Sequence, residues 1–172
     1  MDEKTLLDRA RAGDRKSLEL LLRDNYKIIY GYLLKLTMNE EVTKDITQEV
    51  MVKAIVNINK FKGDSKFSTW LISIASNLYK DSVRKNKQMS NLSIEDTVVR
   101  DSHNVEDTVI NKDTVRRMEN MLKDFPLEKR MVFILKNYYH YSYEEISSIL
   151  NCPIGTVRSR LHYCIKKLRS LI

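Results

Sequence analysis

The chain has 172 residues, of which 42% are hydrophobic, so it can form one domain or two small ones with packed cores. Glycine occurs four times and proline twice, and no run alternates apolar and polar residues, so we expect an all-α protein and exclude an exposed β-sheet. The net charge of +7 favours an anionic partner, with nucleic acid as the first candidate and an anionic membrane surface as the second.

The N-terminal residues predict a pair of helices. The first ten, MDEKTLLDRA, lack the apolar core of a secretion signal, and no run reaches the roughly 18 apolar residues of a membrane span, so we expect a cytoplasmic protein. Gly13 and Asp14 separate two helices within residues 1–38. Apolar residues at helical spacing predict their buried faces: Leu6, Leu7 and Ala10, then Leu18, Leu21, Leu22, Tyr26, Ile29, Leu33 and Leu36.

The next helix is predicted from Met38-Asn39 to about Asn59. Its buried seam is expected at apolar positions four residues apart: Val42, Ile46, Val50, Ala54 and Ile58. Polar residues off this seam give the helix an acidic, amide-bearing side: Asp45, Gln48, Glu49 and Lys53. Taken alone, such a side is most simply a solvated helix face.

Residues 60–85 combine a basic loop with a helix. Gly63 and Asp64 give turn chemistry to the loop from Lys62 to Lys66, which Phe61 and Phe67 bracket. The helix is expected to bury Trp70, Leu71, Ile74, Ala75 and Leu78, and to expose Asn77, Lys80, Arg84 and Lys85. Aromatic rings, an amide and cations are the groups that extract one base from single-stranded DNA. The alternative is two core phenylalanines beside a solvated basic helix.

Residues 89–112 are predicted to be a flexible linker, because polar residues abound and apolar residues have no steady period. Charge supports this boundary: residues 1–88 carry 17 basic and 12 acidic side chains, residues 89–112 carry 2 and 5, and residues 113–172 carry 11 and 6. Two basic helical domains, 1–88 and 113–172, joined by an acidic linker suggest two contacts with one polyanion.

The C-terminal domain is predicted to hold four helices. The apolar faces of the first two are expected at Val115, Met118, Met121, Leu122 and Phe125, and, after Pro126, at Met131, Val132, Leu135 and Tyr138. Ser142 and Glu145 have capping-box spacing at the start of the third helix, which Asn151-Cys152-Pro153 ends. The last two helices should bury Ile146, Ile149 and Leu150, then Val157, Leu161, Ile165 and Leu168.

The last helix has a polar, basic side: Thr156, Arg158, Ser159, His162, Tyr163, Lys166 and Arg169. Two short helices joined by a tight turn, with the second one basic, are typical of a helix-turn-helix whose second helix enters the DNA major groove. The alternative is an amphipathic hairpin with a solvated basic face.

The two cysteines, Cys152 and Cys164, give no sign of a disulfide or a metal site. Cys164 falls on an apolar helix side, so we expect a buried hydrophobe. A metal site that used both thiols and His162 would lack a fourth ligand. No nucleophile with a base and no carboxylate cluster stands out. We therefore predict no metal, no cofactor, no catalytic residue and no small-molecule substrate.

Together these segments resemble, over nearly the whole chain, the extracytoplasmic-function (ECF) class of bacterial RNA polymerase sigma factors. DITQEVMVKA resembles the core-polymerase-binding motif, and FKGDSKFSTWLISIASNLYKDSVRK resembles the promoter-melting and minus-ten recognition region. FPLEKRMVFIL and YSYEEISSILNCPIGTVRSRLH resemble the C-terminal domain that reads the minus-thirty-five element. The resemblance implies a transcription initiation factor, not an enzyme, with core RNA polymerase and promoter DNA as partners.

The resemblance also implies roles for individual residues. The residues facing the clamp helices of polymerase would be Asp45, Gln48, Glu49, Val52 and Lys53. The pocket for a flipped non-template base would be formed by Phe61, Lys62, Gly63, Asp64, Ser65, Lys66, Phe67, Ile74 and Asn77, with Lys80, Arg84 and Lys85 along the phosphates. The upstream duplex would meet Thr156, Arg158, Ser159, Arg160, His162, Tyr163 and Lys166. We expect Arg158 at a base edge, since arginine suits guanine.

Three positions depart from the family pattern: Met51, Ser147 and Tyr163 stand where phenylalanine, alanine and arginine are usual. The last change removes a phosphate or base contact, so the upstream sequence preference does not transfer. Because the chain stops at Ile172 without an added sensory domain, we expect an anti-sigma factor to hold the two domains; whether it is membrane-bound stays open.

Two rival functions remain at this point. The first is a dimeric helix-turn-helix regulator that binds palindromic duplex without polymerase, which a gel shift with and without core polymerase would reveal. The second is a metal-dependent nuclease, which would cleave DNA as the pure protein.

Overall fold

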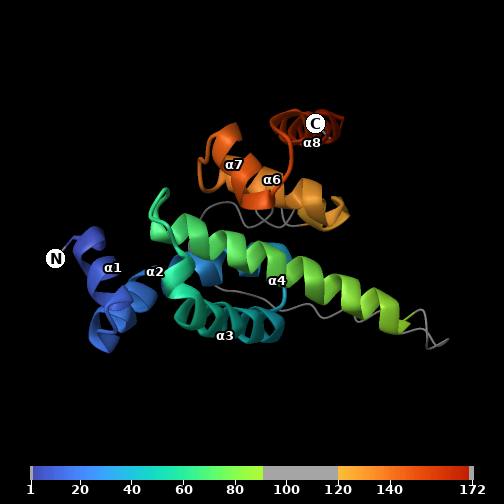
Figure 1. The fold of residues 1–172 in the computed structure, drawn as a ribbon. Helices are drawn as coiled ribbons and strands as arrows, with labels where there is room; N and C mark the ends of the chain where they lie inside the picture. The colour runs from blue at the N-terminus through green and yellow to red at the C-terminus, as the bar shows by residue number, and fades with distance from the viewer. Residues whose placement is uncertain (1, 91–119, 171–172) are drawn as a thin grey trace, which may run out of the picture. The chain divides into compact units, whose positions relative to one another are not determined.

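The computed structural model of the protein describes residues 2–90 and 120–170, which fall into two units, one within 1–92 and one within 93–172 (Figure 1). Within the described ranges all regular structure is helical, so the predicted all-α, two-domain fold is confirmed. None of the helices in these ranges combines the length and the apolar character needed to cross a membrane.

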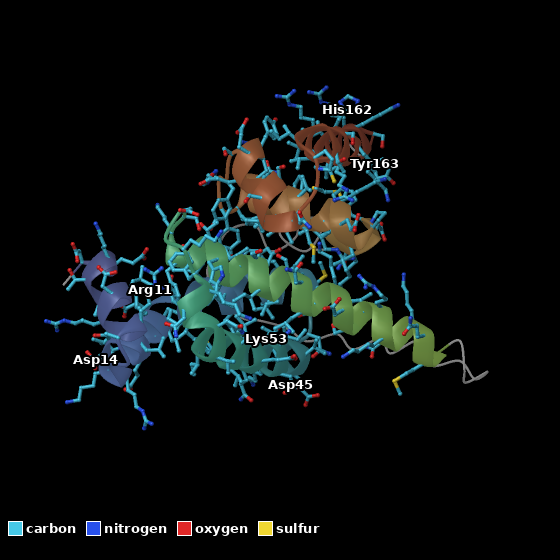
Figure 2. All side chains as sticks on the ribbon, viewed as in Figure 1. Arg11, Asp14, Asp45, Lys53, His162 and Tyr163 are labelled. Atoms are coloured by element: carbon cyan, nitrogen blue, oxygen red, sulfur yellow. The ribbon has the colours of Figure 1, made fainter. Side chains whose placement is uncertain are left out.

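The first unit begins with α1 (Glu3–Arg11) and α2 (Arg15–Thr37), which meet at the predicted turn. Gly13 has φ +95°, a conformation that side chains with a Cβ rarely adopt. Asp14, labelled in Figure 2, caps α2: its carboxylate accepts hydrogen bonds from the Lys16 backbone N–H at 3.1 Å and the Ser17 hydroxyl at 2.7 Å. These bonds lower the pKa of Asp14, with the Ser17 bond as the largest cause.

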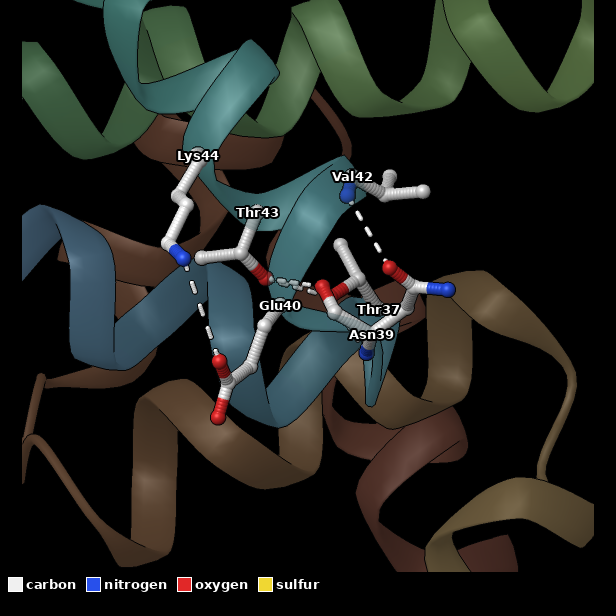
Figure 3. A network of polar contacts seen from close by, with 6 residues as sticks. All are labelled: Thr37, Asn39, Glu40, Val42, Thr43 and Lys44. Atoms are coloured by element: carbon white, nitrogen blue, oxygen red, sulfur yellow. Dashed lines mark hydrogen bonds and ion pairs between the residues drawn. The ribbon is translucent and has the colours of Figure 1, made fainter. Parts of the chain in front are cut away.

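A polar corner joins α2 to α3 (Glu40–Asn57), as Figure 3 shows. Asn39 caps α3 by accepting from the Val42 backbone N–H at 3.0 Å. The Thr37 and Thr43 hydroxyl oxygens lie 2.6 Å from each other and 3.0 and 2.7 Å from the Asn39 carbonyl oxygen, so two hydroxyl protons serve three contacts. These side chains satisfy backbone groups that the helix ends leave unpaired, so the corner has a defined geometry.

The core of the first unit lies between α2, α3 and α4 (Phe67–Ser90). Its buried apolar side chains include Leu21, Ile29, Leu33, Leu36, Ile46, Val50, Ala54, Leu71, Ile72 and Ala75. The fully buried Tyr32 places its hydroxyl 2.7 Å from that of Ser76, which donates to the Ile72 carbonyl at 2.8 Å. Tyr32 is therefore a packing residue, and its polar tip is satisfied.

The predicted seam of α3 is wrong at its first position. Val42 is 38% exposed, whereas Thr43 and Thr47 are buried, and the Thr47 hydroxyl donates to the Thr43 carbonyl at 2.7 Å. A row with spacing four advances about 40° per step around a helix of 3.6 residues per turn, so the row winds off the buried face. Tyr26 of α2, also expected in the core, is 42% exposed.

A short 3-10 helix, η1 (Ile58–Lys60), follows α3 and leads into the loop before α4. Helix α4 continues through Ser90, two residues past the predicted end of the first domain. The remainder of the predicted linker and the predicted helical positions Val115 and Met118 lie outside the described residues.

The second unit contains helical residues 120–124, α6 (Leu127–Asn137), α7 (Tyr143–Leu150) and α8 (Ile154–Arg169). The capping box predicted at α7 is confirmed: Glu145 N–H donates to the Ser142 hydroxyl at 3.1 Å, and Ser142 N–H donates to the Glu145 carboxylate at 2.7 Å. Asn151 ends α7 with φ +49°. The helix-turn-helix prediction is thus matched by two helices joined at Asn151–Pro153.

The buried residues of the second unit are mostly those expected: Leu122, Phe125, Met131, Val132, Leu135, Ile146, Ile149, Leu150, Val157 and Leu161. Cys164 is buried too, as predicted, whereas Ile165 is 38% exposed and Tyr138 is exposed. Cys164 and Val157 are seven residues apart and share a face with Leu161, and Ile165 lies about 100° from Cys164 around the helix, at the edge of that face.

Candidate nucleic-acid interface

The five residues predicted to face polymerase are all exposed on α3: Asp45, Gln48, Glu49, Val52 and Lys53. Figure 2 labels two of them on α3: Asp45 lies at the edge of α3 away from α4 in that view, and Lys53 lies at the other edge. Val52 is 58% exposed and Val56 75% exposed, and Ile55 is exposed beside them. Val52, Ile55 and Val56 thus form an exposed apolar stripe, and carboxylates flank it. Because exposing apolar side chains to water is unfavourable, such a stripe is characteristic of a protein-binding surface.

Ile55 and Val56 are not among the residues predicted to face polymerase. Both are apolar residues that lie off the predicted seam. This position off the buried face is the sequence signal that could have predicted an exposed apolar surface. Ile55 and Met51 also line a groove of about 770 Å³ against the first half of α2. The α2 side of this groove comprises Arg15, Leu18, Glu19, Leu22, Arg23, Tyr26 and Lys27.

An aromatic cluster supports the loop between η1 and α4. The Phe61 ring centroid lies 5.6 Å from that of Phe67 and 5.3 Å from that of Trp70. Phe67 is fully buried and Phe61 is only 3% exposed, which matches the alternative of two core phenylalanines, and Phe67 does not line the pocket at this loop. The α4 backbone turns its first residue inward, and the ring completes the core beneath the loop.

A pocket of about 220 Å³ opens at this loop. It is lined by Lys60, Phe61, Lys62, Asp64, Ser65 and Trp70. Four of these belong to the predicted base pocket, whereas Lys60 was not considered and Trp70 was expected in the core. Trp70 is half-buried. The pocket is smaller than the roughly 300 Å³ or more of drug-sized ligand sites, and its lining combines the half-buried Trp70 ring with two lysines.

One face of α4 leads away from this pocket. Ile74 and Asn77 follow Trp70 at four and seven residues, a spacing that places them in one row. Ile74 is half-buried, and Asn77 is exposed. Of the predicted phosphate contacts, Arg84 and Lys85 are exposed, and Lys80 is half-buried. Ile74 and Asn77 thus neighbour the pocket along α4 but do not line it.

The exposed face of α8 carries Arg158, Ser159, His162 and Lys166, with Thr156 half-buried at its start. Figure 2 shows His162 on the outer side of α8. The Arg158 guanidinium carbon lies 5.8 Å from the ring centroid of Tyr143, and Lys136 Nζ lies 4.7 Å from the same centroid. This aromatic ring from α7 orients a cation at the beginning of α8, where a recognition helix contacts base edges.

Arg160 and Tyr163, also predicted to contact DNA, are engaged within the second unit. Arg160 forms an ion pair with Glu128 of α6 and lies 3.7 Å from the Cys152 sulfur. Lys129 Nζ lies 3.3 Å from the centroid of the Tyr163 ring, and this ring packs edge-on against that of Phe125. Arg160 is half-buried on the flank of α8 that faces α6, whereas Tyr163 is 39% exposed, so the contact of Tyr163 with DNA stays a prediction.

Cys164 and the acidic residues form no metal centre. Cys164 Sγ donates weakly to the Lys129 carbonyl at 3.5 Å, and burial raises the pKa of its thiol to about 11. Among residues 2–90 and 120–170, no group of three His, Cys, Asp or Glu side chains converges to hold an ion.

Comparisons with known proteins agree with this division into two units. Residues 21–89 match the Sigma-70 region 2 family, and residues 116–168 match the Sigma-70 region 4 family. The ECF RNA polymerase sigma factor SigW of Bacillus subtilis is 32% identical and covers 96% of this chain and 94% of its own length. The RNA polymerase sigma-H factor of Pseudomonas aeruginosa is 27% identical, covering 92% and 88%.

Two solved structures share the fold. One is the sigma factor RpoE of Bartonella quintana in complex with the anti-sigma factor NepR, with a TM-score of 0.71, 22% identity and coverage of 91% and 94%. The other is CnrH in complex with the cytosolic domain of CnrY, with a TM-score of 0.71, 18% identity and coverage of 98% and 96%. Since regions 2 and 4 occur in order and a relative above 30% identity spans almost the whole chain, this protein belongs to the ECF class of RNA polymerase sigma factors.

Proposed function

We propose that this sigma factor binds upstream promoter duplex with α8 and captures one unpaired non-template base in the pocket before α4. The observation that carries the proposal is the pocket itself, in which the half-buried Trp70 ring lies beside Lys60 and Lys62, and Phe61, which is only 3% exposed, also lines it. Rings accept the face of any base, and cations hold the flanking phosphates.

The energetics favour capture of a base only after the duplex opens. Unpairing one base costs a few kcal/mol, and stacking it on an aromatic wall returns about 1–3 kcal/mol. The exposed Asn77 amide lies in the same row of α4 as Trp70, about two turns further on. An amide is suited to reading the edge of a base. The preference for a minus-ten sequence then arises partly from the free energy of binding the extruded base.

The exposed side of α3 is the proposed surface for core polymerase. The carboxylates of Asp45 and Glu49 would complement basic groups of polymerase. The stripe of Val52, Ile55 and Val56 would supply the apolar centre of that interface. This surface is distinct from the loop pocket, so the N-terminal unit can hold polymerase and DNA at the same time.

We further propose that an anti-sigma factor controls the protein in the cytoplasm. The support is the fold shared with RpoE and CnrH, which were solved in complex with NepR and with the cytosolic domain of CnrY. Such a partner would compete with polymerase or DNA for the surfaces described above. The chemistry proposed needs no covalent step, in keeping with a transcription regulator.

Base capture is tested with a promoter fragment carrying 2-aminopurine in the non-template minus-ten strand, whose fluorescence rises when it leaves the stack. We expect polymerase with the wild-type protein to raise the signal, and Asn77→Ala and the Lys60→Ala/Lys62→Ala double variant to reduce it while upstream duplex binding persists. Lys123→Ala, an exposed lysine outside α8, is the matched control. Equal loss of both activities would contradict the division of labour between the units.

A further inference from the structure

Helix α1 lies before residue 21, where the region 2 match begins, and the sequence analysis assigned it no chemistry. Its first and last residues nevertheless contact the two ends of the loop that forms the pocket. Glu3 contacts Phe67, where the loop enters α4, and Arg11 contacts Phe61, where the loop leaves η1.

The Glu3 contact completes the N-terminus of α4. The Phe67 backbone N–H donates to Glu3 Oε1 at 3.1 Å in a partly buried position. This N–H is one of the four donors that a helix start leaves without a partner inside the helix. A carboxylate at that end also interacts favourably with the helix dipole. A residue 64 positions earlier therefore fixes where α4 begins.

The Arg11 contact holds the other end of the loop and its turn. An Arg11 guanidinium N–H donates to the Phe61 carbonyl, and the guanidinium carbon lies 5.6 Å from the Phe61 ring centroid. A Cβ placed on Gly63 would lie 3.8 Å from Arg11 Nη2, so the same group also abuts the turn. The Arg11 side chain is 30% exposed and its Nη1 lies 3.8 Å from Asp8 Oδ1, whereas its buried Nε has no hydrogen-bond partner among the described residues.

These two contacts are a fixed distance apart. Arg11 follows Glu3 by eight positions in α1, which corresponds to a rise of about 12 Å along the helix axis. Helix α1 is itself anchored, since Leu6, Leu7 and Ala10 are buried and Asp2 accepts from the Thr5 N–H at 2.9 Å. A rigid element that joins both ends of a loop limits the conformations the loop can adopt.

We propose that Glu3 and Arg11 are positioning residues for promoter opening, which hold the loop of residues 61–67 in the shape that receives the base. The inference rests on the proposed base capture at this loop. A preformed pocket does not have to be ordered when DNA arrives, so this ordering cost is not subtracted from the energy of capture.

The test compares Glu3→Ala, Glu3→Gln and Arg11→Ala with Arg9→Ala, an exposed arginine on the same helix. Because glutamine keeps an acceptor oxygen, Glu3→Gln should stay within about twofold of wild type in the 2-aminopurine assay. Glu3→Ala and Arg11→Ala should each lose about tenfold in open complexes, the effect of removing a hydrogen bond to a charged group. Arg9→Ala should be unchanged.

Two readouts separate positioning from general destabilisation. Trp70 is the only tryptophan and lines the pocket, so its emission without DNA should shift in Arg11→Ala and Glu3→Ala but not in Arg9→Ala. Affinity for core polymerase, which uses the exposed side of α3, should stay unchanged in all four variants. Loss of polymerase affinity together with opening would mean that α1 is merely structural and would overturn the proposal.

The outcomes also distinguish the proposed role of α1 from the base-capture proposal on which it rests. If Asn77→Ala fails to open the promoter while Glu3→Ala and Arg11→Ala open it normally, base capture stands and the role of α1 is refuted. If Asn77→Ala and the lysine double variant also open it normally, the base-capture proposal itself is refuted.

Discussion

Arg160 of α8 forms an ion pair with Glu128 of α6, and only 19% of the Arg160 side chain is exposed. The Cys152 sulfur, in the turn between α7 and α8, lies 3.7 Å from the same guanidinium. Arg160 therefore connects three parts of the second unit, although it directly follows two exposed residues of α8, Arg158 and Ser159.

Replacing Arg160 by alanine should destabilise the second unit by about 1 kcal/mol, because the ion pair and the packed side-chain stem are both lost. Hydrogen–deuterium exchange of the α8 amides in the full chain measures this as roughly fivefold faster exchange. Arg158→Ala, at an exposed position, is the matched control and should leave exchange unchanged. Normal exchange with weakened duplex binding in Arg160→Ala would return Arg160 to the DNA-contacting row.

Arg158→Ala should weaken upstream duplex binding by about 1–3 kcal/mol and relax the base preference at one position. Its guanidinium is exposed above the Tyr143 ring, where it can reach a guanine edge. Lys166→Ala should instead weaken binding to all sequences and reduce the salt slope by about one. Fluorescence anisotropy with matched and mutated promoter duplexes at several salt concentrations separates the two; an unchanged affinity would remove Arg158 from recognition.

Asp45→Ala and Glu49→Ala should each reduce affinity for core polymerase by about tenfold, since both carboxylates flank the exposed apolar stripe of α3. Glu40→Gln is the control, because this exposed carboxylate lies on another side of α3 and pairs with Lys44 at 3.9 Å. Biolayer interferometry with core polymerase gives the affinities, and thermal unfolding confirms that the variants fold. Wild-type affinity in both variants would move the polymerase surface elsewhere.

The second unit should lose stability as pH rises from about 9 to 11. Burial raises the pKa of the Cys164 thiol from 9.0 to about 11, so over this range the unfolded chain releases a proton that the folded chain retains. The contribution is fully present below pH 9. Burial also raises the pKa of Tyr139, from 10.0 to about 12, which extends the effect to higher pH.

Thermal unfolding followed by circular dichroism from pH 8 to 10.5 tests this dependence. Cys164→Ala should lower the midpoint at pH 8, because a buried side chain becomes smaller, but its midpoint should fall less steeply with pH. Tyr139→Phe should flatten the curve only above about pH 10. A Cys164→Ala profile parallel to that of wild type would show that the thiol is not the titrating group.

Local signals in the sequence were sufficient where a single helix determines the outcome. The capping box at Ser142, the turn at Gly13 and the buried positions Ile146 and Val157 depend on residues within a few positions of one another, and each was predicted. The helix-turn-helix followed from the same signals.

Long-range contacts account for the features that were missed. The ion pair of Arg160 depends on Glu128, 32 residues earlier, whereas the burial of Phe67 depends on the nearby Phe61 and Trp70 and was one of the two predicted alternatives. The link from Glu3 to Phe67 spans 64 residues and has no counterpart in spacing or periodicity. Exposure of Val42 could have been anticipated, since a spacing of four drifts around a helix.

The central claim is that this chain directs core polymerase to defined promoters, and run-off transcription with purified core polymerase across a library of genomic fragments tests it most directly. We predict transcripts that start at discrete positions, require the protein, and share paired upstream elements at a constant separation. Failure to associate with core polymerase, with no start sites above those of core polymerase alone, would contradict the account.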